Sequence, residues 1–299
     1  MSPARRLARA LYARASASSA LRRPVAALRS HPRVRALARR HVDVLLAGAP
    51  SWANVDAALR LLAEDASQPI VFGPWEGGLA EELLYWAPFV RWATERFSLA
   101  PERVVVASRS GAAAFYDGSA ATFLGLGEAE ADRLPEGAVF RPEPVLKLVE
   151  RYRAGLDAPR PLLKRALHQR LPALAPDAPA DAYMVVALSP SPACPDTVAN
   201  RRLAEELSQA LSAAGRVVPA TGDERPGALH GLVAGSTGLV SAYSGTALLG
   251  LLSAVPTVAV RSRDGAVAEA DLDLAQRVAS RLGTSFVVLE AADVASLAI

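Results

Sequence analysis

Cysteine, histidine and long hydrophobic runs are scarce in this sequence. Its 299 residues include one cysteine, Cys194, and four histidines, which excludes a disulfide framework and a cysteine-rich metal site. No stretch reaches the roughly 20 consecutive apolar residues of a membrane-spanning helix. The patterns GxGxxG and GxxxxGK(S/T) are also absent, which argues against nicotinamide-dependent enzymes and P-loop nucleotidases. We therefore expect no metal and no cofactor.

Acidic residues are absent from the first 42 residues, which contain eleven of the 33 basic residues. The rest of the chain has 22 basic against 30 acidic residues, so the net charge of +3 conceals a basic arm and an acidic body. Apolar residues of the arm recur at helical spacing, which predicts a basic amphipathic helix over residues 1–41. Such a helix either binds an anionic membrane surface or another polyanion, or packs its apolar stripe on the body of the protein.

Beyond the arm, short β-branched runs alternate with amphipathic segments, which is typical of a parallel α/β fold. We expect strands at residues 69–72, 103–107, 183–188, 216–219, 238–242, 257–260 and 285–289. We expect helices at residues 54–64, 79–97, 145–153, 162–169, 197–214, 226–234, 246–253 and 268–282, with Pro88 kinking the second. The proline-rich stretch 171–181 is the expected linker between an N-terminal domain, residues 42–170, and a C-terminal Rossmann-like domain, residues 182–299.

The clearest functional pattern is a strand, a polar turn and a helix within residues 235–260. The strand contains Ser241 near its end, and the turn reads Tyr243-Ser244-Gly245-Thr246. Backbone N–H groups at a helix N-terminus bind phosphate, and the neighbouring hydroxyl groups and glycine suit a diphosphate. The turn is therefore either a nucleotide-phosphate site or an ordinary serine N-cap with a glycine in a tight turn.

Three further groups near this domain have two interpretations each. Arg201, at the start of a helix, either contacts a phosphate or is solvated. His230 is either a donor-site residue or, as we expect, part of a helix surface. The only acidic DxD triplet, Asp271-Leu272-Asp273, lies in an expected helix, so we interpret its carboxylates as a solvated face and not as a metal site.

Residues 73–92 resemble the N-terminal signature of bacterial GT-B-like proteins of polysaccharide biosynthesis, in which a Gly-Pro-Trp turn precedes a helix reading approximately E-L-L-Y-W-x-P-F-x-R-W. Residues 104–118 look like the next strand and loop of these proteins, where a Ser-Arg-x-Gly turn precedes an aromatic-Tyr pair. Residues 235–260 are similar to the donor side of heptosyltransferase-like enzymes. One departure is Gly78, which stands where the family has an acidic residue; Glu76 is the nearest substitute.

The resemblance implies a GT-B fold, with two Rossmann-like domains facing a cleft, and transfer of a sugar from a nucleotide-sugar donor without a metal. An inverting enzyme of this kind needs a general base, for which the candidates are Glu76, Glu82 and Asp117. It also needs positive or dipolar groups for the leaving diphosphate. Arg109 is the candidate for a phosphate of donor or acceptor. The aromatic side chains of the signature are expected to be mostly core, and Trp75, in the turn, is the one best placed to stack on a sugar.

Two alternatives stay open beside the transferase. The missing acid at Gly78 favours a non-catalytic GT-B-fold scaffold or binding subunit of a polysaccharide or surface-assembly system. Another enzyme of nucleotide sugars, such as an epimerase, would use the same architecture. For the transferase we expect a glycan or lipid-linked acceptor, no nucleic acid, and a cytoplasmic location, peripheral at the inner face of the membrane through the basic arm.

Overall fold

The computed structural model describes residues 46, 51–65, 68–126, 138–156, 161–172, 181–221 and 224–297. The chain divides into two units after Ser67. In the first unit, the helix α4 (Trp52–Glu64) begins at an N-cap, Ser51, whose side chain accepts from the backbone N–H of Asn54. This helix confirms the one predicted over residues 54–64. The predicted basic arm, residues 1–41, lies outside the described residues, as does most of the predicted linker.

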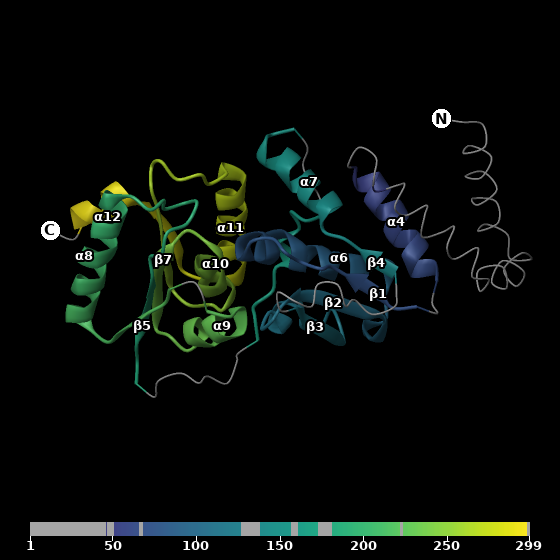
Figure 1. The fold of residues 1–299 in the computed structure, drawn as a ribbon, viewed down its shortest axis with the longest axis horizontal. Helices are drawn as coiled ribbons and strands as arrows, with labels where there is room; N and C mark the ends of the chain where they lie inside the picture. The colour runs from purple at the N-terminus through teal and green to yellow at the C-terminus, as the bar shows by residue number, and fades with distance from the viewer. Residues whose placement is uncertain are drawn as a thin grey trace, which may run out of the picture. The chain divides into compact units, whose positions relative to one another are not determined.

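The second unit contains two separate parallel sheets (Figure 1). The first has the order β3-β2-β1-β4, and its strands are β1 (Ile70–Phe72), β2 (Val104–Arg109), β3 (Thr122–Leu126) and β4 (Ala138–Phe140). The central strand β1 is fully buried because it has a parallel neighbour on each side. We call residues 68–156, which hold this sheet, the first half.

The second sheet has the order β6-β5-β7-β8-β9, again with parallel pairs throughout. Its strands are β5 (Met184–Ala187), β6 (Val217–Pro219), β7 (Gly238–Ala242), β8 (Thr257–Arg261) and β9 (Phe286–Glu290). The helices between and after them are α8 (Val198–Ala214), α9 (Pro226–Ala234), α10 (Gly245–Leu252), α11 (Glu269–Leu282) and α12 (Ala291–Leu297). We call residues 183–297 the second half. The α/β class is therefore confirmed for both sheets.

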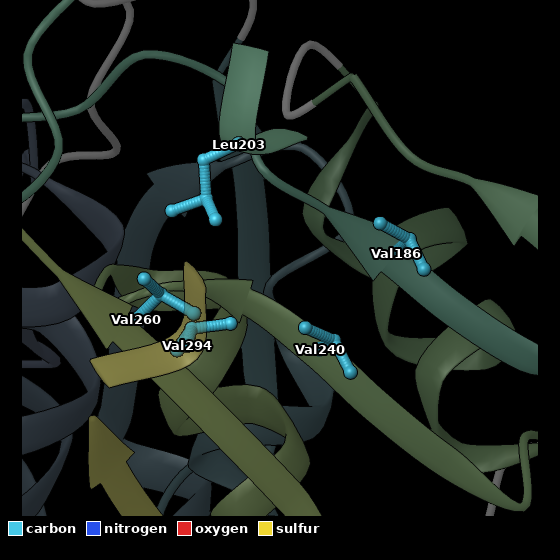
Figure 2. Close-up of a cluster of buried hydrophobic side chains, with 5 residues drawn as sticks. All are labelled: Val186, Leu203, Val240, Val260 and Val294. Carbon is cyan, nitrogen blue, oxygen red and sulfur yellow. The ribbon is translucent and has the colours of Figure 1, made fainter. Parts of the chain in front are cut away.

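One core of the second half lies between its sheet and two helices. Val186, Val240 and Val260 of neighbouring strands pack with Leu203 of α8 and Val294 of α12 (Figure 2). Side chains alternate between the faces of a strand, so Ser241 and Tyr243 lie on the opposite face from Val240. On that face Tyr243 packs in a second apolar cluster with residues of α10 and α11.

Residues 79–97 form one continuous helical stretch, as predicted. It consists of α5 (Leu79–Glu81), the π-helical turn η2 (Glu82–Trp86) and α6 (Ala87–Phe97). Pro88 has no N–H to donate to the carbonyl of Leu84 four residues earlier, and that carbonyl accepts instead from Nε2 of His168 at 2.8 Å. Burial lowers the pKa of His168 to about 4, which keeps the ring neutral. The wider turn η2 ends two residues before Pro88, and both features are common causes of a helix kink.

The helix predicted over residues 162–169 is wrong. The segment contains turns and a short 3-10 helix, η5 (Arg165–Leu167). Its carbonyls face arginine side chains: Arg91 donates to Leu167 and Arg281 donates to His168. Because Arg91 lies on α6 and Arg281 on α11, this segment is fastened to both halves.

Several contacts join the two halves, and three of them use segments that follow the carboxyl ends of strands. Gly245 begins α10 after β7 and touches Leu79, the first residue of α5. Gly111, after β2, touches Gly227 near the start of α9. In the third contact a residue of η2 bonds to α11, which follows β8. The carboxyl ends of the strands in both sheets therefore lead into the contact region.

Candidate functional site

The carboxyl end of the first sheet is built on a glycine turn. After β1 the peptide Gly73-Pro74 is cis, and Gly73 has φ +131°. The backbone N–H of Gly73 bonds to Phe140 of β4, and that of Trp75 bonds to Ala107 of β2. The turn therefore extends the sheet beyond β1 and fixes the start of the loop that leads to α5.

A buried carboxylate, Glu82, lies behind this edge. It is 0% exposed and accepts hydrogen bonds at Oε1 from the hydroxyls of Ser108 and Tyr116, the latter at 2.6 Å. Its Oε2 lies 3.2 Å from Nε of Arg109. Burial raises the pKa of Glu82, while the two hydroxyls and Arg109 oppose that rise. The two hydroxyl hydrogen bonds and the ion pair with Arg109 offset part of the cost of burying this carboxylate.

Arg109 connects this buried cluster to the surface. Its side chain is 34% exposed, and it also donates to the backbone carbonyl of Gly77 in the loop after β1. Glu82 and Gly77 together fix the direction of the guanidinium at the end of β2. The structure therefore brings together two of the predicted site residues, Glu82 and Arg109, with Glu82 as a positioning residue that lies out of reach of solvent.

The other carboxylates predicted for this edge are open to solvent. Glu76 is exposed in the loop four residues after β1, and Asp117 is exposed at the end of η4 (Ala113–Tyr116). Gly78, where the resemblance calls for an acid, is exposed as well, and a Cβ added there would meet only the flexible carboxylate of Glu81. Of the predicted base candidates, Glu76 and Asp117 are thus the two with free access to a ligand.

The predicted phosphate turn of the second half is largely covered. Ser244 is the N-cap of α10, and its side chain accepts from the backbone N–H of Thr246. A Cβ on Gly245 would lie 2.5 Å from Cβ of Leu79, so glycine is needed for this close approach. Tyr243 and Thr246 are buried, at 6% and 7% exposure. The geometry has the N–H groups of a helix start, with an apolar side chain of the first half in front of them.

The two other residues predicted to bind the nucleotide, Ser241 and Arg201, differ in burial. Ser241 is fully buried, and its hydroxyl has no hydrogen-bond partner within the described part of the chain. Arg201 is exposed on α8 and pairs with Asp196 at 3.5 Å. The structure thus places Ser241 beside the phosphate turn on β7, and Arg201 on a solvated helix.

The interpretation of Asp271 as a solvated carboxylate is wrong. Asp271 is 8% exposed and accepts from the hydroxyl of Tyr85 at 2.5 Å. It also pairs with Arg153, the last residue of α7 (Glu143–Arg153), through two bonds of 3.0 and 2.6 Å. Asp273, on the other face of α11, is exposed and pairs with Arg277, as expected for a solvated helix face.

Two further ring side chains are buried, which agrees with the core interpretation of Trp75 and contradicts the surface position expected for His230. Trp75 is 3% exposed and stacks on Trp86 with 5.6 Å between ring centroids, so it belongs to the core and does not offer a face to a sugar. His230 is fully buried, not part of a helix surface, and lies 6.3 Å from the ring of Phe115 between centroids. Neither ring nitrogen of His230 has a partner among the described residues.

Metal sites and membrane-spanning helices are both absent from the described residues. These residues hold no group of three His, Cys, Asp or Glu side chains placed to bind a metal ion. None of their helices combines the length and the apolar character that crossing a membrane requires.

The chain matches no protein-family model and no curated protein. Among solved structures it is similar to the bacterial iron-containing dodecameric glycosyltransferase TibC from enterotoxigenic E. coli H10407, with a TM-score of 0.40 and 15% identity over 65% of this chain. It is also similar to the dodecameric iron-containing heptosyltransferase TibC in complex with ADP-D-beta-D-heptose, with a TM-score of 0.39 and 14% identity over 65% of this chain. The match spans 58% of the length of each of these structures.

Proposed function

We propose that this chain is a metal-independent glycosyltransferase of the GT-B type, which moves a sugar from a nucleotide-sugar donor to a glycan or lipid-linked acceptor. The observation that carries the proposal is the meeting of two parallel sheets at the carboxyl ends of their strands. In open α/β sheets, ligands bind outside these ends, where the strand order reverses. Two such edges brought together supply one binding surface for a donor and one for an acceptor.

The donor site of this proposal is the start of α10. The sheet order places β7 beside β5, the point at which the order reverses. The N–H groups after Ser244 and the buried hydroxyl of Ser241 then face the diphosphate, and charge develops on that group as the sugar leaves. Binding requires Leu79 to move away from Gly245, because the two are in contact.

The donor site is tested by thermal-shift measurements with UDP, GDP, CMP and dTDP. One nucleotide is expected to raise the melting temperature by several degrees, because a ligand that binds only the folded state stabilises it. The double variant Ser244→Ala/Thr246→Ala is expected to lose that increment. Ser51→Ala, which removes the N-cap of α4 in the other unit, is the matched control and should retain it. A ligand increment that survives the double variant would place the nucleotide elsewhere.

The catalytic base of this proposal is Glu76. It is the exposed carboxylate closest in sequence to the end of β1, whereas Glu82 is buried, accepts two hydrogen bonds and is paired with Arg109. Glu76→Gln is expected to lower the turnover of the donor by about 100-fold or more, with its binding unchanged. The corresponding amide variant of the second exposed carboxylate, Asp117→Asn, is the control. Loss of turnover in Asp117→Asn alone would move the role of base to Asp117.

One observation favours a second candidate function, a non-catalytic scaffold with the same fold. The start of α10 is covered by Leu79, and Gly78 lacks the carboxylate that the family resemblance implies. A scaffold needs no access to the helix N-terminus, so this packing would be its resting and only state. The absence of any nucleotide-induced shift in folded protein would favour this function over the transferase.

A further inference from the structure

Arg153 makes an unusually complete set of contacts with anionic and aromatic groups of three helices. Besides its two bonds to Asp271 of α11, its Nη2 lies 3.2 Å from Oε1 of Glu81 in α5. Its guanidinium also lies over the ring of Tyr85, 5.5 Å from the centroid. Its side chain is only 25% exposed. A planar guanidinium with two parallel bonds to one carboxylate has the geometry that also binds phosphate.

This cluster lies beside the start of α10. Tyr243 directly precedes the N-cap Ser244. The pKa of Tyr243 is raised, mainly by burial and also by the charge of Asp271, while the charge of Arg153 lowers it. The hydroxyl of Tyr243 has no hydrogen-bond partner within the described residues, although the residue is only 6% exposed. A partly buried cation, the unpartnered hydroxyl of Tyr243 and a helix N-terminus are therefore grouped here.

The charges of the cluster explain why no anion can simply be added to it. One arginine is shared by two carboxylates, so the formal charges of the three groups sum to −1. The helix that carries Glu81 is also the one that begins with Leu79, the residue in front of Gly245. Release of Arg153 from Glu81 and movement of Leu79 away from α10 therefore involve the same short helix.

We propose that Arg153 is an anion-binding residue of the contact region, held in reserve by the carboxylates of Glu81 and Asp271. On binding, oxygens of a diphosphate replace these carboxylates at the guanidinium, and α5 moves so that Leu79 uncovers the start of α10. The inference rests on the proposed function and deepens it, because it assigns a first-half residue to the donor diphosphate. It also gives the covered start of α10 a role as a closed state.

The test measures the affinity of the full chain for inorganic pyrophosphate by titration calorimetry. Asp271→Asn removes the competing charge and is expected to tighten binding about tenfold, whereas Arg153→Gln is expected to weaken it about tenfold or more. The matched controls are Asp273→Asn and Arg277→Gln, the exposed pair on the same helix, which should leave the affinity unchanged. If Asp271→Asn does not fold, Glu81→Gln replaces it with the same expected direction.

The outcomes separate the inference from the proposed function. Opposite changes in the two cluster variants support the exchange, even if no nucleotide binds, and that combination would refute the nucleotide-sugar function alone. A merely structural ion pair would weaken binding in both variants or in neither, and either result would overturn the inference. No pyrophosphate binding to any folded variant would overturn it as well. Faster hydrogen exchange of residues 79–86 on adding pyrophosphate is the expected sign of the movement of α5.

Discussion

Gly73→Ala is expected to destabilise the protein by about 3–6 kcal/mol, a large part of the stability of an ordinary domain. Two causes act together. Gly73 has φ +131°, which side chains rarely adopt, and its added Cβ would lie 2.3 Å from the carbonyl oxygen of Ala107. That oxygen accepts the backbone bond of Trp75, so it cannot move away without breaking the turn. Urea unfolding monitored by circular dichroism measures the loss.

The control for Gly73→Ala is Gly118→Ala. Gly118 also has a positive φ, +70°, but an added Cβ would have no atom within 4 Å. Strain without a collision is expected to cost about 1 kcal/mol. Equal losses in the two variants would contradict the role of the close approach between Gly73 and β2 and leave backbone strain as the whole effect.

Glu82→Ala is expected to cost about 3–5 kcal/mol, because it removes the acceptor of two buried hydroxyls and the counter-charge of Arg109. Glu82→Gln keeps an oxygen for Ser108 and Tyr116 but ends the ion pair, so it should cost about 1–3 kcal/mol. The exposed Glu102 provides the control, and Glu102→Gln should stay within about 0.5 kcal/mol of the parent protein. Denaturant unfolding gives all three values.

The relative losses of unfolding free energy in the two Glu82 variants show which interactions of the cluster stabilise the fold. If Glu82→Gln were as damaging as Glu82→Ala, the charge would dominate and the two hydroxyl bonds would contribute little. If Glu82→Ala were neutral, the cluster would not stabilise the fold, and its role as the support of Arg109 would be lost with it.

The architecture of the second half could be predicted closely from local patterns. Its strands are β-branched runs between clear helix ends, such as the N-cap Thr197 before α8 and Gly283 after α11. In the first half, β3 and β4 escaped prediction. β3 is a half-exposed edge strand that contains Gly125, and β4 has only three residues, so neither gives a periodic signal.

The candidate site could be predicted only in part, because its geometry depends on partners distant in the sequence. The resemblance pointed to Glu82 and Arg109, but the local pattern did not reveal that they form a pair. Asp271 lies at helical spacing from the buried residues Leu274, Ala275 and Val278, and only its charge suggested a solvated position. Its partners Tyr85 and Arg153 belong to the other half, and such long-range pairing is not encoded in helical periodicity.

The contact between Gly111 and Gly227 has a consequence for how the protein can evolve. A Cβ on Gly111 would lie 2.7 Å from the backbone nitrogen of Gly227, and a Cβ on Gly227 would lie 2.9 Å from the carbonyl oxygen of Gly111. The two halves meet there backbone to backbone. Selection therefore favours the absence of a side chain at both positions, and not any particular chemical group. Neither position can drift independently, although neither would attract notice as a site of chemistry.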